Sequence, residues 1–80
     1  MREVYVLINT IEKVKQFVQS VSSYEGDLDL STGRYIIDAK SIMGIFSLDI
    51  SSPLKLIIHN DETADGLIAE LKDYIVGSDS

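Results

Sequence analysis

The sequence contains no cysteine, no tryptophan, one proline and a single histidine. The lack of thiols excludes disulfide bonds, thiolate nucleophiles and zinc–thiolate sites. One imidazole cannot supply a paired-histidine metal motif, and neither a Ser-His-Asp arrangement nor a glycine-rich phosphate loop is present. The hydroxyl groups of serine and tyrosine therefore have no base to activate them, so we expect no enzymatic activity, no metal and no other cofactor.

Basic charge and long apolar segments are also scarce. Seven lysine and arginine residues stand against 13 aspartate and glutamate residues, which gives a net charge of −6 and a pI near 4.4. This charge would repel a phosphate backbone, which argues against a nucleic-acid partner. No stretch approaches the length of a membrane span, and residues 1–8 are too short for a secretory signal. We predict a cytoplasmic protein without a membrane partner.

Residues 1–80 are expected to form one small domain. The sequence is 45% hydrophobic and 25% charged, which is typical of a globular protein and not of a disordered one. A chain of this length can bury a single core without metals or disulfides.

Apolar spacing predicts the first two elements. Val4, Val6 and Ile8 alternate with Tyr5 and Leu7, which indicates a strand that is apolar on both faces. A helix should follow, capped by Asn9 or Thr10. Its buried stripe has the three-four spacing of one helix face and contains Ile11, Val14, Phe17, Val18 and Val21.

The rest of the chain predicts three more strands and two more helices. Alternation over residues 25–30, a turn at 31–33 and an apolar run at 34–39 indicate a hairpin. A short helix should begin at Ser41, and a fourth strand at residues 54–59. The last helix should begin at residues 61–63, stop at Gly77 and leave residues 78–80 as a frayed tail; its apolar positions are Ala64, Leu67, Ile68, Leu71 and Ile75.

The element order is thus β-α-β-β-α-β-α. It predicts an α+β fold in two layers, with three helices on one face of a four-stranded antiparallel sheet. On the opposite face, Tyr5, Leu7 and Ile57 should form an exposed apolar patch. Such a patch is typical of partner binding or of a homodimer, although a partly shielded outer face without a partner is the alternative.

The segment Lys40-Ser41-Ile42-Met43-Gly44 places a serine where the short helix should begin. A serine hydroxyl at that point can accept a hydrogen bond from a free amide of the first turn. The segment strongly resembles the regulatory-serine region of the histidine-containing phosphocarrier protein, HPr, of the sugar phosphotransferase system. The element order is similar to that of the HPr open-faced β-sandwich.

The resemblance implies that Ser41 is phosphorylated by an HPr-type serine kinase. It also implies that Ile42 and Met43 form an apolar docking patch, for which we expect one side chain outward and one inward, and that Lys13 and Lys15 contact acidic partner surfaces. A transcriptional regulator is one such partner. The alternative is a purely structural role for each residue: Ser41 is only a cap, Ile42 and Met43 are core residues, and the lysines lie on a solvated helix face.

The loop that carries the phosphate-accepting histidine in HPr proteins is altered in this chain. The corresponding residues 9–14 read Asn-Thr-Ile-Glu-Lys-Val and contain no histidine, arginine or proline. Counting back from Ser41 places the lost histidine at Thr10 or Ile11. We therefore predict an HPr-like regulatory or protein-binding domain without histidine phosphorelay activity.

Two alternative functions remain open. In the first, the protein is a phosphocarrier with a relocated acceptor, for which His59 is the sole imidazole, although a surface histidine beside a helix start is the simpler interpretation. In the second, it is a purely structural interaction domain. The neighbouring acidic residues Asp61, Glu62 and Asp65 are expected at a helix start because of the helix dipole and do not indicate a metal site.

Overall fold

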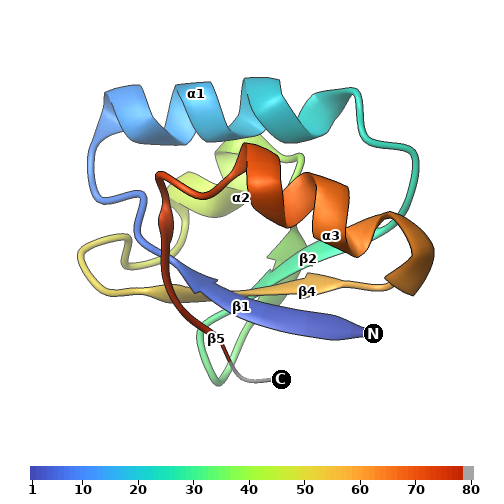
Figure 1. Cartoon of the computed structure of the whole chain (residues 1–80). Coiled ribbons are helices and arrows are strands. Elements are labelled where there is room, and N and C mark those ends of the chain that lie inside the picture. The colour runs from blue at the N-terminus through green and yellow to red at the C-terminus, as the bar shows by residue number, and fades with distance from the viewer. Residues whose placement is uncertain (79–80) are drawn as a thin grey trace.

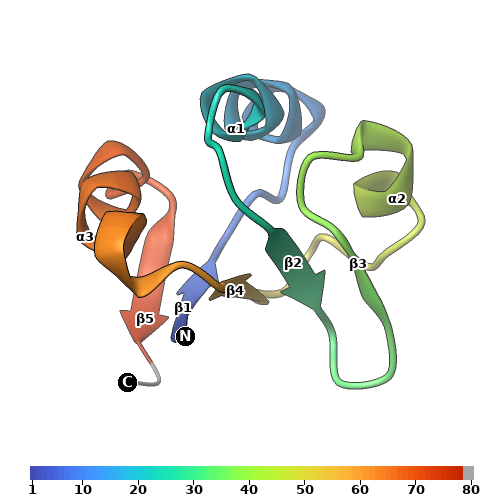
Figure 2. The same ribbon diagram turned by 90° about the vertical axis from the view of Figure 1, so that its right-hand side faces the viewer.

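A computed structural model describes residues 1–78, which form three helices and one five-stranded sheet. Every strand pair is antiparallel, in the order β3-β2-β4-β1-β5. Figures 1 and 2 show all three helices on one face of this open sheet. The predicted α+β architecture is confirmed. In chain order the elements are β1 (Arg2–Val6), α1 (Ile11–Ser22), β2 (Leu28–Ser31), β3 (Ile36–Asp38), α2 (Ile42–Phe46), β4 (Leu54–Ile58), α3 (Asp61–Glu70) and β5 (Ile75–Ser78).

The hydrophobic core lies between the sheet and the helices. The alternating residues of β1 and β4 face it, and the register places Val4 opposite Leu56 and Val6 opposite Leu54. In Figure 2, α1 lies above the middle of the sheet, with α2 and α3 on either side of it. Phe17 of α1 is fully buried and contacts the ring of Tyr74 edge-on, with ring centroids 5.9 Å apart.

Helix α1 begins as predicted, but its buried stripe is shorter than predicted. Thr10 is the N-cap, and Val14, Phe17 and Val21 are buried. The prediction that Ile11 belongs to the buried stripe is wrong, because its side chain is 59% exposed. Ile11 is the first helical residue and lies beyond the contact of α1 with the core, so its spacing alone does not bury it.

The C-terminal segment differs from the prediction, because α3 ends at Glu70 and a fifth strand follows. Ile75 lies in β5, paired with β1 opposite Val6, and Gly77 lies in the same strand opposite Tyr5. The expected four-stranded sheet therefore has five strands. Of the predicted tail, Ser78 is the last residue of β5, and residues 79–80 lie outside the described residues.

Strand β3 is an edge strand and is shorter than the predicted strand over residues 34–39. The turn before it contains Gly33 with φ of +86°, a left-handed conformation that glycine adopts without a steric penalty. Tyr35 and Ile36 are 62% and 66% exposed, so the apolar run at this edge is only partly covered.

The outer face of the sheet does not carry the fully exposed apolar patch that was predicted for residues 5, 7 and 57. Tyr5, Leu7 and Ile57 are each half-buried. Lys55 contributes to this shielding, because its Nζ atom lies 5.8 Å from the centroid of the Tyr5 ring and 3.8 Å from a carboxylate oxygen of Glu3. The alternative of a partly shielded outer face describes this surface better.

Candidate functional site

Ser41 caps α2, as predicted. Its backbone is extended, with φ of −94° and ψ of 104°, and its Oγ atom accepts a hydrogen bond from the amide of Gly44 at 3.1 Å. The Ser41 carbonyl accepts from the amide of Ile45 at 3.0 Å, and the Ser41 amide donates to the carbonyl of Asp38 at 3.0 Å. The side chain is half-buried. The backbone thus fixes the position of the hydroxyl at the start of the helix.

Gly44 provides the space that the Ser41 side chain occupies. A Cβ atom at position 44 would lie 3.1 Å from Ser41 Oγ, 3.4 Å from Ser41 Cβ and 3.5 Å from Ile37 Cβ. These distances are tight enough that a larger residue would displace the capping hydroxyl. The close approach explains why the residue three positions after the serine is glycine.

The two residues after Ser41 point in different directions, as predicted. Ile42 is half-buried and packs against the core, whereas the Met43 side chain is 77% exposed. Phe46, at the end of the same helix, is 40% exposed. Helix α2 therefore presents two large apolar side chains to solvent while Ile45 anchors it in the core.

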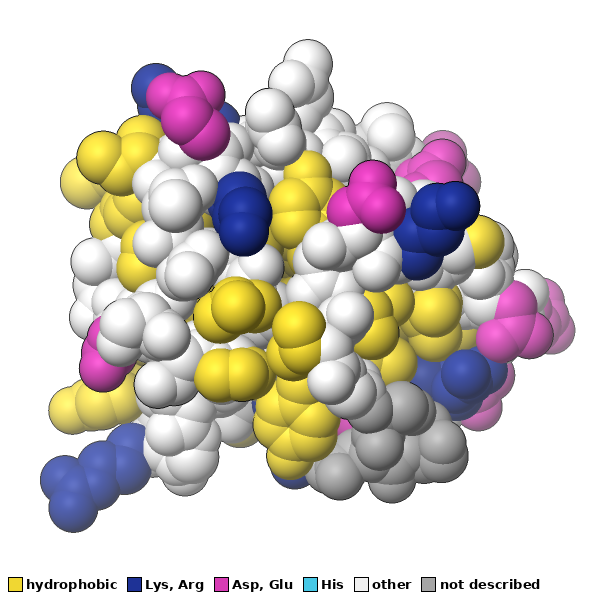
Figure 3. All heavy atoms as spheres, turned by 60° about the vertical axis from the view of Figure 1, so that its left-hand side comes forward, with side chains coloured by type: hydrophobic (Ala, Val, Ile, Leu, Met, Phe, Trp, Pro, Cys, Tyr) yellow, Lys and Arg dark blue, Asp and Glu magenta, His cyan; other side chains and the backbone are white. Residues whose placement is uncertain are grey.

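Thr10 and Ile11, the two positions predicted for the lost histidine, are both exposed. Thr10 Oγ1 accepts a hydrogen bond from the amide of Lys13 at 3.1 Å, so the hydroxyl serves as a helix cap. Lys13 Nζ donates to Asn9 Oδ1 at 3.4 Å, and Lys15 is exposed on the same helix. Figure 3 views the face that includes the left-hand side of Figure 1, where α1 begins, and it shows hydrophobic side chains among scattered basic and acidic ones.

His59 is exposed and already has a carboxylate partner. Its Nε2 atom lies 2.8 Å from Asp29 Oδ2. Asp27 and Asp38 line the same surface groove, together with Lys40. An incoming phosphoryl group would be repelled by these carboxylates. The surroundings favour a surface histidine over a relocated phosphate acceptor.

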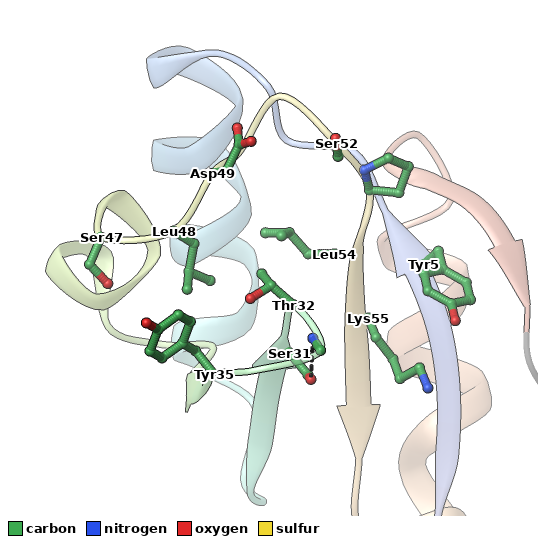
Figure 4. A pocket seen from close by; sticks show the side chains of 12 residues that line it. Tyr5, Ser31, Thr32, Tyr35, Ser47, Leu48, Asp49, Ser52, Leu54 and Lys55 are labelled. Carbon is green, nitrogen blue, oxygen red and sulfur yellow. Dashed lines mark hydrogen bonds between the residues drawn. The ribbon is translucent and has the colours of Figure 1, made fainter.

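A half-open groove of about 540 Å³ lies at the end of the sheet where the loop from α2 enters β4. In Figure 4, Tyr35 lies beside Ser47 and Leu48, and Tyr5 lies on the other side of β4. Asp49, also at this groove, accepts hydrogen bonds from the hydroxyl and the amide of Ser51, which lower the pKa of its carboxyl group. A negative charge is therefore retained just after α2.

Lys40, Tyr24 and Thr63 form a contact chain that the sequence did not predict. Lys40 Nζ donates to the Tyr24 carbonyl at 2.5 Å, and the Tyr24 hydroxyl lies 2.5 Å from Thr63 Oγ1. These contacts span 16 and 39 residues. No local spacing pattern could have indicated them.

Within residues 1–78, no three histidine, aspartate or glutamate side chains lie close enough together to hold a metal ion. In the same part of the chain, no helix is long and apolar enough to cross a membrane. The carboxylates at the start of α3 are engaged elsewhere: Asp65 accepts from the guanidinium of Arg2 at 2.7 Å, and Asp61 pairs with the amino group of Met1.

The crystal structure of HPr-C-His from Thermoanaerobacter tengcongensis is similar to this chain, with a TM-score of 0.72 and 28% sequence identity. The similarity covers 91% of this chain and 93% of that chain. The fold is HPr-like. No protein-family profile matches the sequence, and no curated protein does. The HPr likeness therefore extends over most of the chain.

Proposed function

We propose that this protein is an HPr-like regulatory domain, related to the phosphotransferase system, that binds other proteins under the control of Ser41 phosphorylation and carries no phosphohistidine. The observation that carries the proposal is the position of Ser41, at the cap of α2 and within the Lys40–Gly44 segment. In this proposal the domain is cytoplasmic, is not an enzyme and is the substrate of an HPr-type serine kinase.

The kinase reaction would form a bond between Ser41 Oγ and the γ-phosphorus of ATP, with release of ADP and the hydroxyl proton. The phosphate would add about −1.5 to −2 charges beside Met43, which is 77% exposed. A change of this size alters the electrostatic potential of the α2 surface without requiring the helix to unfold, because the new oxygens can still accept from the Gly44 amide.

The partner surface in this proposal combines α2 with the first turns of α1. Met43 supplies an exposed, adaptable apolar contact beside the half-buried Ile42, and Lys13 and Lys15 supply positive charge. Acidic surfaces of a serine kinase or of a transcriptional regulator would fit this combination. A phosphate at Ser41 would oppose the same acidic surfaces, which gives the modification a direct effect on binding.

The residues at the start of α1 support the proposed absence of phosphorelay activity. A phosphorylated imidazole transfers its phosphate readily because the protonated nitrogen leaves easily. Thr10 would form a stable ester instead, and its hydroxyl already serves as the cap of α1. Glu12 adds negative charge to the same turn.

Incubation with an HPr-type serine kinase and ATP, followed by mass spectrometry, tests the proposal. We expect one phosphate per chain, located on Ser41 and absent from the Ser41→Ala variant. Ser47→Ala is the matched control, because it removes a serine hydroxyl from the other end of α2 and should leave incorporation unchanged. Equal incorporation in Ser41→Ala and in the unmodified protein would contradict the assignment.

A second pair of variants tests the docking surface. Met43→Ala removes an exposed side chain and should lower kcat/KM of the kinase several-fold without changing the stability of the substrate. Val76→Ala removes a 55% exposed apolar side chain from β5, at the opposite edge of the sheet from β3, and should leave kcat/KM unchanged. Equal effects of the two variants would remove the case for docking on α2.

A further inference from the structure

The ammonium group of Lys40 contacts Tyr24, which lies 16 residues away in the sequence. The Nζ atom donates to the carbonyl of Tyr24 at 2.5 Å and lies 6.0 Å from the centroid of the Tyr24 ring. The backbone of Lys40 is fixed separately, because its amide donates to Asp38 Oδ1 at 2.9 Å. The side chain can therefore change its partner without moving the backbone at the start of α2.

Lys40 shares a surface groove with Asp27, Asp29 and Asp38, yet its ammonium group makes its hydrogen bond to a neutral carbonyl. Among residues 1–78, no carboxylate lies within ion-pair distance of its ammonium group. The hydrogen bond to Tyr24 is already charge-assisted by the ammonium group, but a neutral carbonyl is still a weaker partner than an anion, because only an anion adds attraction between opposite charges. A dianion attached to the next residue would compete strongly with the Tyr24 carbonyl.

Tyr24 connects this contact to a distant element. Its side chain packs against the core, and its hydroxyl group lies 2.5 Å from Thr63 Oγ1 in the first turn of α3. One residue thus contacts Lys40 through its carbonyl and α3 through its hydroxyl. Because both groups belong to one residue, we expect a change at the carbonyl to affect the contact of the hydroxyl.

We propose that Lys40 links phosphorylation of Ser41 to the start of α3, because its ammonium group changes partner when the phosphate is added. The phosphate draws the ammonium group from the Tyr24 carbonyl to itself, and the released Tyr24 shifts relative to Thr63. This inference rests on the proposed function, because it takes phosphoserine at position 41 as the input. It extends the effect of the modification from the α2 surface to the opposite end of the helical layer.

The test uses full-length protein in which phosphoserine is introduced at position 41 during synthesis, so that no kinase is needed. Amide chemical shifts are compared with and without the phosphate. We expect changes at Glu25, whose amide belongs to the same peptide unit as the Tyr24 carbonyl, and at Thr63. In the Lys40→Met variant without phosphate, the Glu25 shift should already lie near its phosphorylated value.

Addition of phosphate to Lys40→Met should leave Glu25 and Thr63 unchanged, whereas the Lys40→Arg variant should respond as the unmodified protein does. Thr63→Val removes the hydroxyl that contacts Tyr24, so it should retain the response at Glu25 and lose it in α3. Unchanged Glu25 and Thr63 shifts in the phosphorylated protein, or equal responses in Lys40→Met, would overturn the inference even if a kinase modifies Ser41. A kinase that ignores Ser41 would contradict the proposed function but not the link itself.

Discussion

The hydroxyl of Ser41 has a structural role that can be measured without any kinase. It accepts a hydrogen bond from the first turn of α2, and loss of such a cap costs about 1 kcal/mol. Ser41→Ala should therefore lower the midpoint of thermal unfolding by roughly 4–8 °C for a domain of this size. Ser41→Asn should retain most of the stability, because asparagine is also a good N-cap. Equal midpoints for Ser41→Ala and the unmodified protein would show that the cap contributes nothing.

Gly44 and Gly66 provide a matched pair of helical glycines with opposite surroundings. A Cβ atom at Gly66 would meet nothing within 4 Å, whereas one at Gly44 would lie 3.1 Å from Ser41 Oγ. Gly66→Ala should stabilise the protein by about 0.5–1 kcal/mol because alanine favours the helix. Gly44→Ala should gain nothing or lose stability, because the same gain is offset by displacement of the cap.

Urea unfolding of the two alanine variants measures this difference directly. A stability increase at Gly44 as large as that at Gly66 would mean that the Ser41 side chain is not confined as the geometry indicates.

The serine site was predictable from sequence at this scale because capping depends on residue type and on a spacing of three. The Lys40–Tyr24 contact was not predictable, because it depends on how two distant segments meet.

At the scale of single elements, α1 offers a test of burial within one apolar stripe. Phe17 is fully buried against the core and Tyr74, whereas Ile11 is 59% exposed. Phe17→Ala should reduce the free energy of unfolding by about 3–5 kcal/mol. Ile11→Ala should change it by no more than about 0.5 kcal/mol. Similar losses in the two variants, measured by urea unfolding, would place Ile11 in the core.

The difference between Ile11 and Phe17 marks where helical spacing ceases to predict burial. Spacing identifies one side of a helix, but the length of helix that contacts the sheet is decided by the tertiary structure. The same limit applies to the segment after Glu70. Ile75 fits the spacing of α3, yet it pairs with Val6 in β5, because the edge of β1 offers backbone partners that the sequence pattern does not represent.

Strand β5 had a weak signal of its own. Residues 74–76 read Tyr-Ile-Val, a composition that favours strands over helices, and Gly77 follows them. Four residues are too few for alternation to outweigh a helical spacing that already accounts for Ile75. The strands with longer alternation, β1 and β4, were predicted, but with different bounds: β1 ends at Val6 and leaves out Leu7 and Ile8, and β4 ends at Ile58 and leaves out His59. The antiparallel sheet and the placement of all helices on one face were predicted correctly.

At the scale of the whole molecule, the distribution of charge favours a regulatory or protein-binding role over a phosphocarrier role. His59 lies in a groove with Asp27, Asp29 and Asp38, and Thr10 is engaged as a cap beside Glu12. Neither place offers a free imidazole in positive surroundings. A single Thr10→His substitution should therefore remain a poor phosphate acceptor, because Glu12 still repels the incoming group.

The absence of histidine phosphorelay activity is tested most directly by incubation of the unmodified protein with enzyme I and phosphoenolpyruvate, followed by measurement of acid-labile phosphate. We predict that no acid-labile phosphate forms on the chain and that none is passed on to a sugar permease component, while an HPr protein with its histidine loop is charged in the same mixture. Rapid, acid-labile phosphorylation of this protein that disappears in the His59→Ala variant would contradict the claim and would identify it as a phosphocarrier with a relocated acceptor.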